Sequence, residues 1–290
     1  MKKITILIPI YNDWQSVSKL LDEININIKG LDFEFSIIVI NDASTEAESL
    51  AAENLDNLKS VRVMNMKENR GHARCIATGL KYVLENEEFD YVIPMDGDGE
   101  DRPEEIKFLI EEANYSPDKA IVGERIKRSE NLIFKLSYSI HKLITYTFTG
   151  QSIKFGNYTC LPKSTVEKMI KDKATWSSFS GALTKVEKNR KASPSTRGTR
   201  YFGPSKMNFL NLAKHSLAII AVFKINVIFR SALFYAIYLY LISNNITFIT
   251  SIPLALIIIF LISVLSISKR EDLNELKNSI NNLASFDKIK

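Results

Sequence analysis

Two carboxylates separated by a single residue, Asp96 and Asp98, follow a short apolar run at residues 91–95. Carboxylate oxygens at the end of a strand suit a hard divalent cation such as Mg²⁺ or Mn²⁺, which often binds a few carboxylates together with substrate phosphates. Such a cation would neutralise the charge that develops on a departing diphosphate. An Asp-x-Asp sequence also occurs in ordinary surface turns, but its place directly after a predicted strand favours a catalytic metal site.

A third carboxylate, Asp42, occupies the same kind of position after the apolar run at residues 34–40. There it could accept hydrogen bonds from a nucleobase or a ribose. It could equally fix a turn or the start of a helix, a role that Ser44 or Thr45 would also fill. The residue types alone leave both interpretations open.

Basic side chains follow other predicted strands, where they suit phosphate binding. Arg70 and Gly71 lie at a strand-to-helix turn, so a guanidinium and helix-start amides could bind a phosphate there. Further basic residues lie after a fifth apolar run and in a stretch rich in Ser, Gly and Pro: Arg125, Arg128, Arg197, Arg200 and Lys206. Arginines this numerous beside a metal site suit a diphosphate or a lipid phosphate. Attraction to an anionic membrane surface is the alternative, especially for Arg128 and Arg197.

The remaining metal-capable side chains predict neither a zinc site nor a disulfide framework. The cysteines Cys75 and Cys160 are far apart, and His72, His141 and His215 are too sparse, so the histidines are interpreted as ordinary surface or helix residues. A reducing compartment is therefore expected. The net charge of +5 suits phosphate-bearing substrates or an anionic membrane surface, and no nucleic acid partner is expected.

Strands that alternate with helices must position these side chains. Short apolar runs predict strands at residues 4–10, 34–40, 61–66, 91–95 and 120–123. Helices are predicted at residues 17–28, 46–58 and 72–84, and from Pro103 onward. This alternation is typical of an α/β fold with a mostly parallel sheet and helices on both faces. Because ligands of such sheets lie beyond the carboxyl ends of the strands, the polar clusters at 11–13, 41–45 and 96–101 should gather at one edge.

The chain beyond the predicted sheet changes in composition. Residues 131–156 predict a helical stretch with several aromatic side chains. Residues 186–206 are basic and rich in Ser, Gly and Pro, which predicts a mobile loop. Residues 207–226 mix apolar and basic side chains and predict a helix at a membrane interface.

Residues 227–268 contain two apolar segments that are separated only by Asn244 and Asn245. The first, at residues 227–243, carries one charge near its start, and the second, at residues 246–268, has roughly the ~20-residue length of a membrane span, so a transmembrane helical hairpin is predicted. The alternative, a hairpin buried in a soluble core, is disfavoured by the uncharged length of the second segment. Basic residues flank both ends, which predicts that both termini are cytoplasmic: Lys214, Lys224, Arg230, Lys269 and Arg270. The polar residues 269–290 predict a short exposed helix in the cytoplasm.

Taken together, these segments resemble the family-2 glycosyltransferases, in particular the dolichyl- and polyprenyl-phosphate sugar synthases. The matching stretches are residues 8–13, 40–45, 69–74 with 79–80, 95–104, 123–125 and 200–206. The likeness covers about residues 3–206, and the apolar hairpin adds to it. The resemblance implies a nucleotide-sugar-binding GT-A fold, with residues 1–206 as a cytoplasmic catalytic domain, and a sugar transfer that inverts the anomeric configuration.

The resemblance also implies roles for individual residues. Asp96 would contact the donor, and Asp98 would be the main ligand of Mg²⁺ or Mn²⁺. The nucleotide-binding residues would be Pro9, Tyr11, Asp13 and Asp42. The residues around the diphosphate or the acceptor phosphate would be Arg125, Ser137, Arg200, Ser205 and Lys206. A membrane-bound homo-oligomer would be consistent with the family.

One departure from the family concerns the acceptor. Relatives often carry Gly-Asp-Phe-Arg-Leu where residues 156–161 of this chain read Gly-Asn-Tyr-Thr-Cys-Leu, so Asn157 replaces an acidic residue and an arginine is lost. A polyprenyl phosphate is already ionised and needs no strong base, whereas a hydroxyl acceptor does. Loss of the aspartate therefore fits a phosphate acceptor, while loss of the arginine weakens the binding of one.

The leading hypothesis is transfer of a sugar from a nucleotide-sugar, UDP- in preference to GDP-linked, to polyprenyl phosphate at the cytoplasmic face of the inner membrane. A close alternative is transfer to a hydroxyl of a surface glycan or glycolipid. A non-catalytic membrane protein that binds a nucleotide is a third possibility. A soluble nucleotidyltransferase would also use strand-end carboxylates but would not explain the hairpin.

Overall fold

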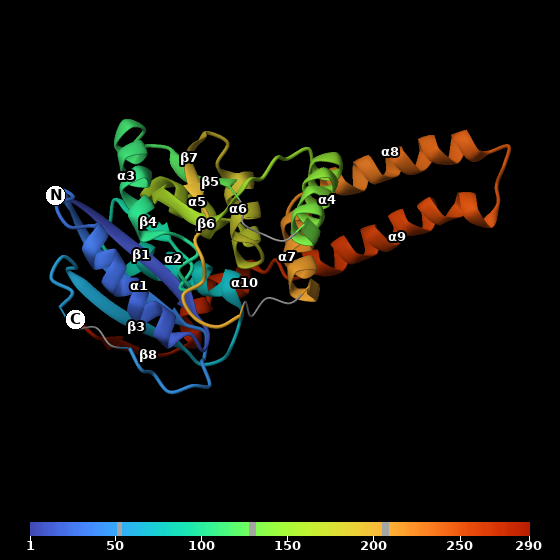
Figure 1. The fold of residues 1–290 in the computed structure, drawn as a ribbon. Coiled ribbons are helices and arrows are strands. Elements are labelled where there is room, and N and C mark those ends of the chain that lie inside the picture. Colours follow the sequence, from blue (N-terminus) through green and yellow to red (C-terminus); the bar gives the residue numbers. More distant parts are fainter. Residues whose placement is uncertain (51–53, 128–131, 205–208) are drawn as a thin grey trace.

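The computed structural model describes residues 1–50, 54–127, 132–204 and 209–290. These residues form an eight-stranded sheet with the strand order β7-β5-β6-β4-β1-β2-β3-β8 (Figure 1). The strands are β1 (Lys2–Ile10), β2 (Phe33–Asn41), β3 (Ser60–Met66), β4 (Tyr91–Pro94), β5 (Ala120–Lys127), β6 (Phe155–Pro162), β7 (Arg190–Thr196) and β8 (Leu283–Lys288).

The centre of the sheet is parallel, as the sequence predicted. β1 pairs in parallel with β2 and β4, and β2 pairs in parallel with β3. β6 runs antiparallel to β4 and β5, and β8 runs antiparallel to β3. The carboxyl ends of β1 to β4 therefore lie at one edge of the sheet, where the predicted polar clusters begin.

Helices cover both faces of the sheet. The helices on one face are α1 (Trp14–Asn27) and α3 (Ile106–Tyr115), and those on the other are α2 (His72–Asn86), α5 (Lys163–Lys171) and α6 (Phe179–Val186). Short 3₁₀ turns precede α3 at η1 (Pro103–Glu105) and follow α5 at η2 (Lys173–Trp176). Apolar side chains of α1 recur every three or four residues, and those of Val17, Leu20 and Ile24 are fully buried against the sheet. Layers on both sides explain why seven consecutive residues of β1 are buried.

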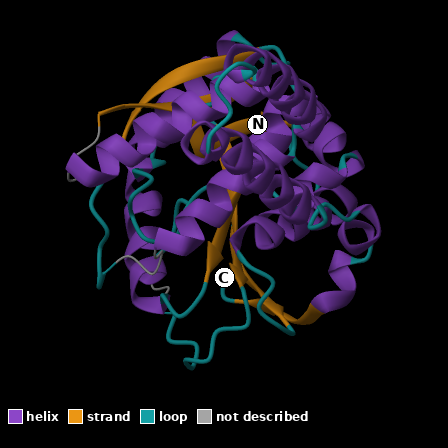
Figure 2. Ribbon diagram, turned by 90° about the vertical axis from the view of Figure 1, so that its right-hand side faces the viewer, coloured by secondary structure: helices purple, strands orange, loops and turns teal. Residues whose placement is uncertain are grey.

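A helical hairpin projects from this α/β body (Figure 1). α7 (Phe209–Ala221) leads into α8 (Lys224–Ile242), and α9 (Phe248–Ser268) returns beside it. Seen from the far end of the hairpin, the helices stand in front of the sheet (Figure 2). Both α8 and α9 are long and apolar enough to cross a membrane, and only 11% of each apolar stretch is buried. This exposure contradicts the alternative of a hairpin buried in a soluble core.

The helix α4 (Leu132–Thr149) packs at the base of the hairpin, where α8 caps its carboxyl end. Arg230 donates a hydrogen bond to the carbonyl of Thr147 at 2.9 Å, and Asn226 donates to the carbonyl of Thr149 at 3.0 Å. A side chain at position 150 would bring a Cβ within 2.8 Å of the Arg230 guanidinium, so Gly150 permits this approach. Carbonyls at a helix end need such partners because no further turn supplies them.

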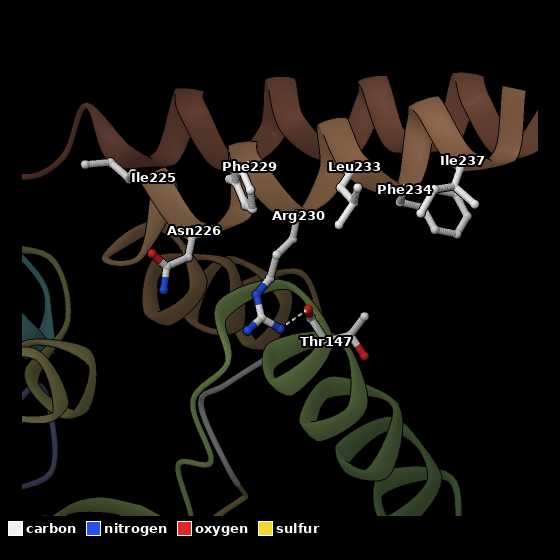
Figure 3. A pocket seen from close by; sticks show the side chains of 8 residues that line it. All are labelled: Thr147, Ile225, Asn226, Phe229, Arg230, Leu233, Phe234 and Ile237. Atoms are coloured by element: carbon white, nitrogen blue, oxygen red, sulfur yellow. Dashed lines mark hydrogen bonds between the residues drawn. The ribbon is translucent and has the colours of Figure 1, made fainter. Parts of the chain in front are cut away.

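An open groove of about 780 Å³ lies between the end of α4 and the apolar side of α8 (Figure 3). Phe229, Leu233 and Ile237 form part of its lining, and Arg230 lies in it beside Thr147. The groove therefore combines an apolar wall on the hairpin with a single guanidinium near the α/β body.

The segment after α9, residues 269–290, returns to the α/β body. It forms α10 (Leu273–Lys277), the 3₁₀ turn η3 (Ser279–Asn282) and β8, which completes the sheet beside β3. Leu276 is fully buried against Ala77 and Trp176. The expectation of a short exposed helix was thus wrong for most of this segment, because β8 finds its hydrogen-bond partners in a strand more than 200 residues earlier.

Three other local predictions differ from the structure. The described part of the connection between β2 and β3 contains no helix at residues 46–58. The predicted loop at residues 186–206 contains β7, which pairs in parallel with β5. β7 is an edge strand, and an edge tolerates Pro194 because its missing N–H leaves no central partner unsatisfied. The predicted helix at residues 131–156 ends earlier, at Thr149, and β6 follows.

Candidate active site

Asp96 lies in the loop that follows β4, within reach of two other elements. Its Oδ1 atom lies 3.2 Å from Nε2 of His72, the first residue of α2. The same oxygen accepts a hydrogen bond from the side-chain amide of Asn157 in β6 at 3.2 Å. The Asn157 amide nitrogen also lies 2.7 Å from His72 Nε2, so the three side chains form one polar cluster.

The electrostatics of this cluster set the charge of Asp96. Burial alone would raise the pKa of Asp96, but the imidazole of His72 and the amide of Asn157 together hold that pKa well below its ordinary value. Burial opposes protonation of His72, yet the charge of Asp96 outweighs it and raises the pKa of His72. His72 is an exposed helix residue, as the sequence predicted, but the fold also places it against the first carboxylate of the site, which the sequence did not predict.

Asp98 faces a different set of partners. Its Oδ1 atom accepts from the backbone N–H of Glu100 at 3.0 Å, and its Oδ2 atom accepts from the guanidinium of Arg200 at 2.8 Å. Burial raises the pKa of Asp98, and the charge of Asp96 adds to the effect. The two carboxylates of the Asp-x-Asp sequence thus lie close enough to interact, each beside a basic side chain.

Asp101 lies beneath the same loop with only 5% of its surface exposed. Its Oδ2 atom accepts from the backbone N–H of Asp96 at 3.0 Å, so it fixes the turn that carries Asp96. Burial first, and the charge of Asp96 second, raise the pKa of Asp101 to about 7. Asp101 was not among the predicted site residues, although it lies within the polar cluster at 96–101.

The segment after β7 packs against the loop that carries Asp96 and Asp98. Arg200 pairs with Asp98 and with Asp13, which directly precedes α1 and makes no side-chain hydrogen bond to the start of that helix. The backbone N–H of Tyr201 donates to the carbonyl of Asp98 at 2.9 Å. Gly99 has a φ of +87°, and a Cβ at this position would overlap the Tyr201 ring, so the loop and the segment fit only with glycine there. Arg200 therefore bridges Asp13, a predicted nucleotide-binding residue, and Asp98, the predicted main metal ligand.

Asp42, which follows β2, accepts hydrogen bonds from the start of α2. Its carboxylate is 4% exposed and accepts from the backbone N–H groups of Arg70 at 2.7 Å and Gly71 at 2.9 Å. Burial raises the pKa of Asp42 despite these hydrogen bonds and one from Cys75. The helix-start amides expected to bind a phosphate are thus already bonded to Asp42, and the Arg70 side chain pairs with Glu68.

The structure brings most of the predicted site residues to the carboxyl edge of the sheet. Pro9 is buried near the end of β1, and Tyr11 is exposed just beyond it. Arg125 of β5 lies close enough that its charge lowers the pKa of both Asp96 and Asp101. The predictions that fall outside the described residues are Arg128, Ser205 and Lys206. Ser137 lies within α4, and its side chain is not described.

The donor atoms present suit a divalent cation that also binds substrate oxygens. Within the described ranges, no three Asp, Glu, His or Cys side chains gather to hold a metal ion by themselves. Burial first, and the charge of Asp96 second, raise the pKa of Asp98, and a divalent cation would offset the repulsion between the two carboxylates. Two carboxylates with further ligands from a diphosphate match the preference of Mg²⁺ and Mn²⁺ for oxygen, so the residues fit the expected ion.

Residues 5–179 match the family model described as Glycosyl transferase family 2. The chain belongs to this family. The resemblance drawn from the sequence motifs is thereby confirmed, including its likeness to the polyprenyl-phosphate branch, because the similar curated proteins are undecaprenyl-phosphate sugar transferases.

Two of these relatives are undecaprenyl-phosphate 4-deoxy-4-formamido-L-arabinose transferases. The one from Klebsiella pneumoniae is 27% identical over 73% of this chain and 64% of its own length. The one from Photorhabdus laumondii is 30% identical over 73% of this chain and 65% of its own length. The family-2 chain thus spans somewhat less than two thirds of the relatives that it matches.

Solved structures confirm the GT-A-like fold. A glucosyl-3-phosphoglycerate synthase from Mycobacterium tuberculosis, solved with Mn²⁺, UDP and phosphoglyceric acid, has a TM-score of 0.56 at 12% identity and covers 78% of each chain. The mannosyltransferase PcManGT from Pyrobaculum calidifontis, solved with GDP-mannose and Mn²⁺, has a TM-score of 0.53 at 14% identity, with 91% of this chain and 86% of its own covered. At these identities the likeness concerns the fold alone.

Proposed function

We propose that this family-2 chain is a glycosyltransferase that moves a sugar from a nucleotide-sugar to polyprenyl phosphate at the membrane surface. The observation that carries the proposal is the carboxylate pair Asp96 and Asp98 at the carboxyl edge of a family-2 sheet, joined to an apolar hairpin. The names of the similar curated proteins support the lipid phosphate as acceptor. An inverting reaction, as the family resemblance implies, needs only one displacement at the sugar carbon.

On this proposal, Pro9, Tyr11, Asp13 and Asp42 lie on the nucleotide side of the site. Asp96 and Asp98 would hold Mg²⁺ or Mn²⁺ together with the diphosphate. When bound, such an ion supplies the positive charge that stabilises the departing diphosphate. The guanidinium of Arg200, whose two terminal nitrogens contact Asp98 and Asp13 in this structure, could bind a phosphate through the same two nitrogens. Arg125 adds positive charge from β5, and Ser137, Ser205 and Lys206 remain proposed phosphate ligands.

The acceptor end favours a phosphate over a hydroxyl. Asn157 contributes a neutral amide where a base would otherwise lie, and an ionised phosphate can attack without one. His72 beside Asp96 supports the alternative of a hydroxyl acceptor, since an imidazole–carboxylate pair can take up a proton. The raised pKa of His72 leaves less of the neutral imidazole at a given pH, which makes it a weaker candidate for this task.

The hairpin would bring the catalytic domain to the lipid. α8 and α9 are proposed to cross the inner membrane with Lys224 and Lys269 on the cytoplasmic side, together with both termini. The groove beside Arg230 offers an apolar wall of phenylalanine, leucine and isoleucine to the chain of a lipid acceptor (Figure 3). A homo-oligomer in the membrane is part of the same expectation from the family.

Membranes that contain the protein provide the test. They are incubated with polyprenyl phosphate, Mg²⁺ or Mn²⁺ and radiolabelled nucleotide-sugars, with UDP-linked donors expected to serve before GDP-linked ones. An organic-extractable sugar-lipid should form, and chelation or Asp98→Ala should reduce its formation by about a hundredfold or more. Asp118→Ala, which changes an exposed aspartate before β5, should leave it unchanged.

The acceptor is tested separately. Nucleotide binding without any sugar-lipid, from every donor offered, would overturn the phosphate acceptor and transfer the proposal to a hydroxyl-bearing glycan or glycolipid. Full retention of activity in Asp98→Ala would overturn the assignment of Asp96 and Asp98 to the active site.

A further inference from the structure

A row of polar side chains crosses three strands beside the proposed donor site. Asn41, the last residue of β2, lies opposite Asn65 of β3, which in turn lies opposite Ser285 of β8. Strand β8 belongs to the segment that returns from the apolar hairpin. The row therefore joins residues that follow the hairpin to the strand ends where the donor is proposed to bind.

Hydrogen bonds run along this row in one direction. The Asn65 amide nitrogen donates to Asp287 Oδ2 at 2.7 Å and to Ser285 Oγ at 3.0 Å. The Asn65 amide oxygen accepts from the amide nitrogen of Asn41 at 2.7 Å. The Asn41 amide oxygen then accepts from the backbone N–H of Ser44 at 2.9 Å.

The row ends in the loop between Tyr11 and Asp13. Ser44 Oγ accepts from the backbone N–H of Asn12 at 2.8 Å, and the Asn12 side-chain oxygen accepts from the backbone N–H of Thr45 at 2.8 Å. Asn12 has a φ of +50°, and Ala43 has a φ of +54°. Residues other than glycine rarely adopt this region, so surrounding hydrogen bonds must hold the two loops in place.

The carboxylate at position 287 and the backbone N–H of Ser44 fix the direction of the row from its two ends. A carboxylate only accepts hydrogen bonds, so Asn65 must turn its NH₂ toward β8 and its oxygen toward Asn41. Asn41 must then turn its NH₂ toward Asn65, which leaves its oxygen free to accept from Ser44. Either amide turned the other way would place two donors or two acceptors against each other.

We propose that Asp287 is a positioning residue for the nucleotide: through Asn65 and Asn41 it orients the loops at residues 11–13 and 43–45 for donor binding. The inference rests on the proposed function, in which Tyr11 and Asp13 bind the donor. Asp287 itself touches neither substrate nor metal. Its effect passes through the orientation of two amides and one strained turn.

Reversing the polarity of the row tests this role in the full-length protein. Asp287→Lys places a donor where an acceptor is required, so Asn65 and Asn41 should turn around and two N–H groups should then meet at Ser44. We expect the donor KM to rise about fivefold, the effect of losing one hydrogen bond, with kcat nearly unchanged. Hydrogen exchange of the Ser44 and Thr45 amides should accelerate by a similar factor.

A second substitution should restore the direction. In the Asp287→Lys background, Asn65→Asp supplies a carboxylate that accepts from both the new lysine and Asn41, so donor KM and amide exchange should return to the wild-type values. Asp56→Lys makes the same charge change at an exposed aspartate between β2 and β3 and should alter neither. A purely structural role predicts no rescue, because Asn65→Asp adds a further change to the same strand pair. A purely electrostatic role predicts only partial rescue, because Asn65→Asp returns one of the two units of charge that Asp287→Lys changes.

Unchanged exchange and unchanged donor KM in Asp287→Lys would overturn the positioning role. An equal rise of KM in Asp56→Lys, or failure of Asn65→Asp to restore a folded double variant, would overturn it as well. Absence of any turnover in the wild type would contradict the proposed function instead. In that case the exchange of Ser44 and Thr45 across the same variants still decides whether Asp287 orients the loops.

Discussion

Substituting Gly99 with alanine should disrupt the contact between the loop after β4, which carries Gly99, and the segment after β7, which carries Tyr201. Gly99 has a φ of +87°, and its missing side chain leaves the space that the Tyr201 ring fills. An alanine in this backbone conformation costs about 1–2 kcal/mol by itself. The overlapping Cβ must also displace the ring, whose hydroxyl donates to Glu23 at 2.6 Å and whose face lies 4.5 Å from the Lys19 ammonium.

Displacing a half-buried tyrosine with one charge-assisted hydrogen bond should cost about another 1–2 kcal/mol, so Gly99→Ala should destabilise the domain by about 2–4 kcal/mol in total. In a Tyr201→Ala background the overlap is absent, and only the backbone cost of about 1–2 kcal/mol should remain. The difference between the two backgrounds measures the contact itself.

Chemical unfolding followed by tryptophan fluorescence suits this cycle. The chain has two tryptophans, Trp14 and Trp176, and both are buried in the α/β body, so the signal reports on that body and is independent of the hairpin. Equal costs of Gly99→Ala in the presence and absence of the Tyr201 ring would refute the packing described here. A cost of the single variant near zero would refute the backbone conformation of Gly99 as well.

Three further variants test other parts of the structure. Leu276→Ala should lower the free energy of unfolding by about 3 kcal/mol, measured by the same fluorescence, because it opens a cavity against Ala77 and Trp176. Because burial raises the pKa of Asp101 to about 7, the folded chain keeps a proton that the unfolded chain releases near pH 4. Stability in the presence of a chelator should therefore fall as the pH rises through this range, and Asp101→Asn should flatten the fall. Asn157→Asp should raise the pKa of His72 further by adding a carboxylate beside it, which an NMR titration of the imidazole would detect.

Local patterns were sufficient to predict the centre of the fold. β1, β2 and β4 are continuous apolar runs because helices cover both faces of the sheet, and each run ends in the polar residues that line the site. The positions of Asp42, Asp96 and Asp98 at strand ends followed from the same runs. The apolar hairpin could also be predicted, because its length and its low charge are properties of the sequence itself.

Features that depend on distant partners were not predictable in this way. β8 is mostly polar and exposed, and it becomes a strand only because β3 offers it an unpaired edge. His72 looks ordinary in the sequence, and only the packing of α2 against β1 places it beside Asp96. Asp101 likewise shows its role only through the backbone of Asp96. The occupation of Asp98 by Arg200 depends on a segment about 100 residues later, which no local pattern encodes.

The return of the chain from the hairpin has a consequence for how the protein is made. A ribosome must synthesise both apolar helices before it reaches β8, so the catalytic body waits for its last strand until the hairpin is already available for insertion. Until then the edge of β3 is open, and an open edge invites pairing with other chains. A shortened, soluble version that ends before α8 would keep that open edge permanently. Attaching the 283–288 strand to it through a flexible linker should reduce its aggregation.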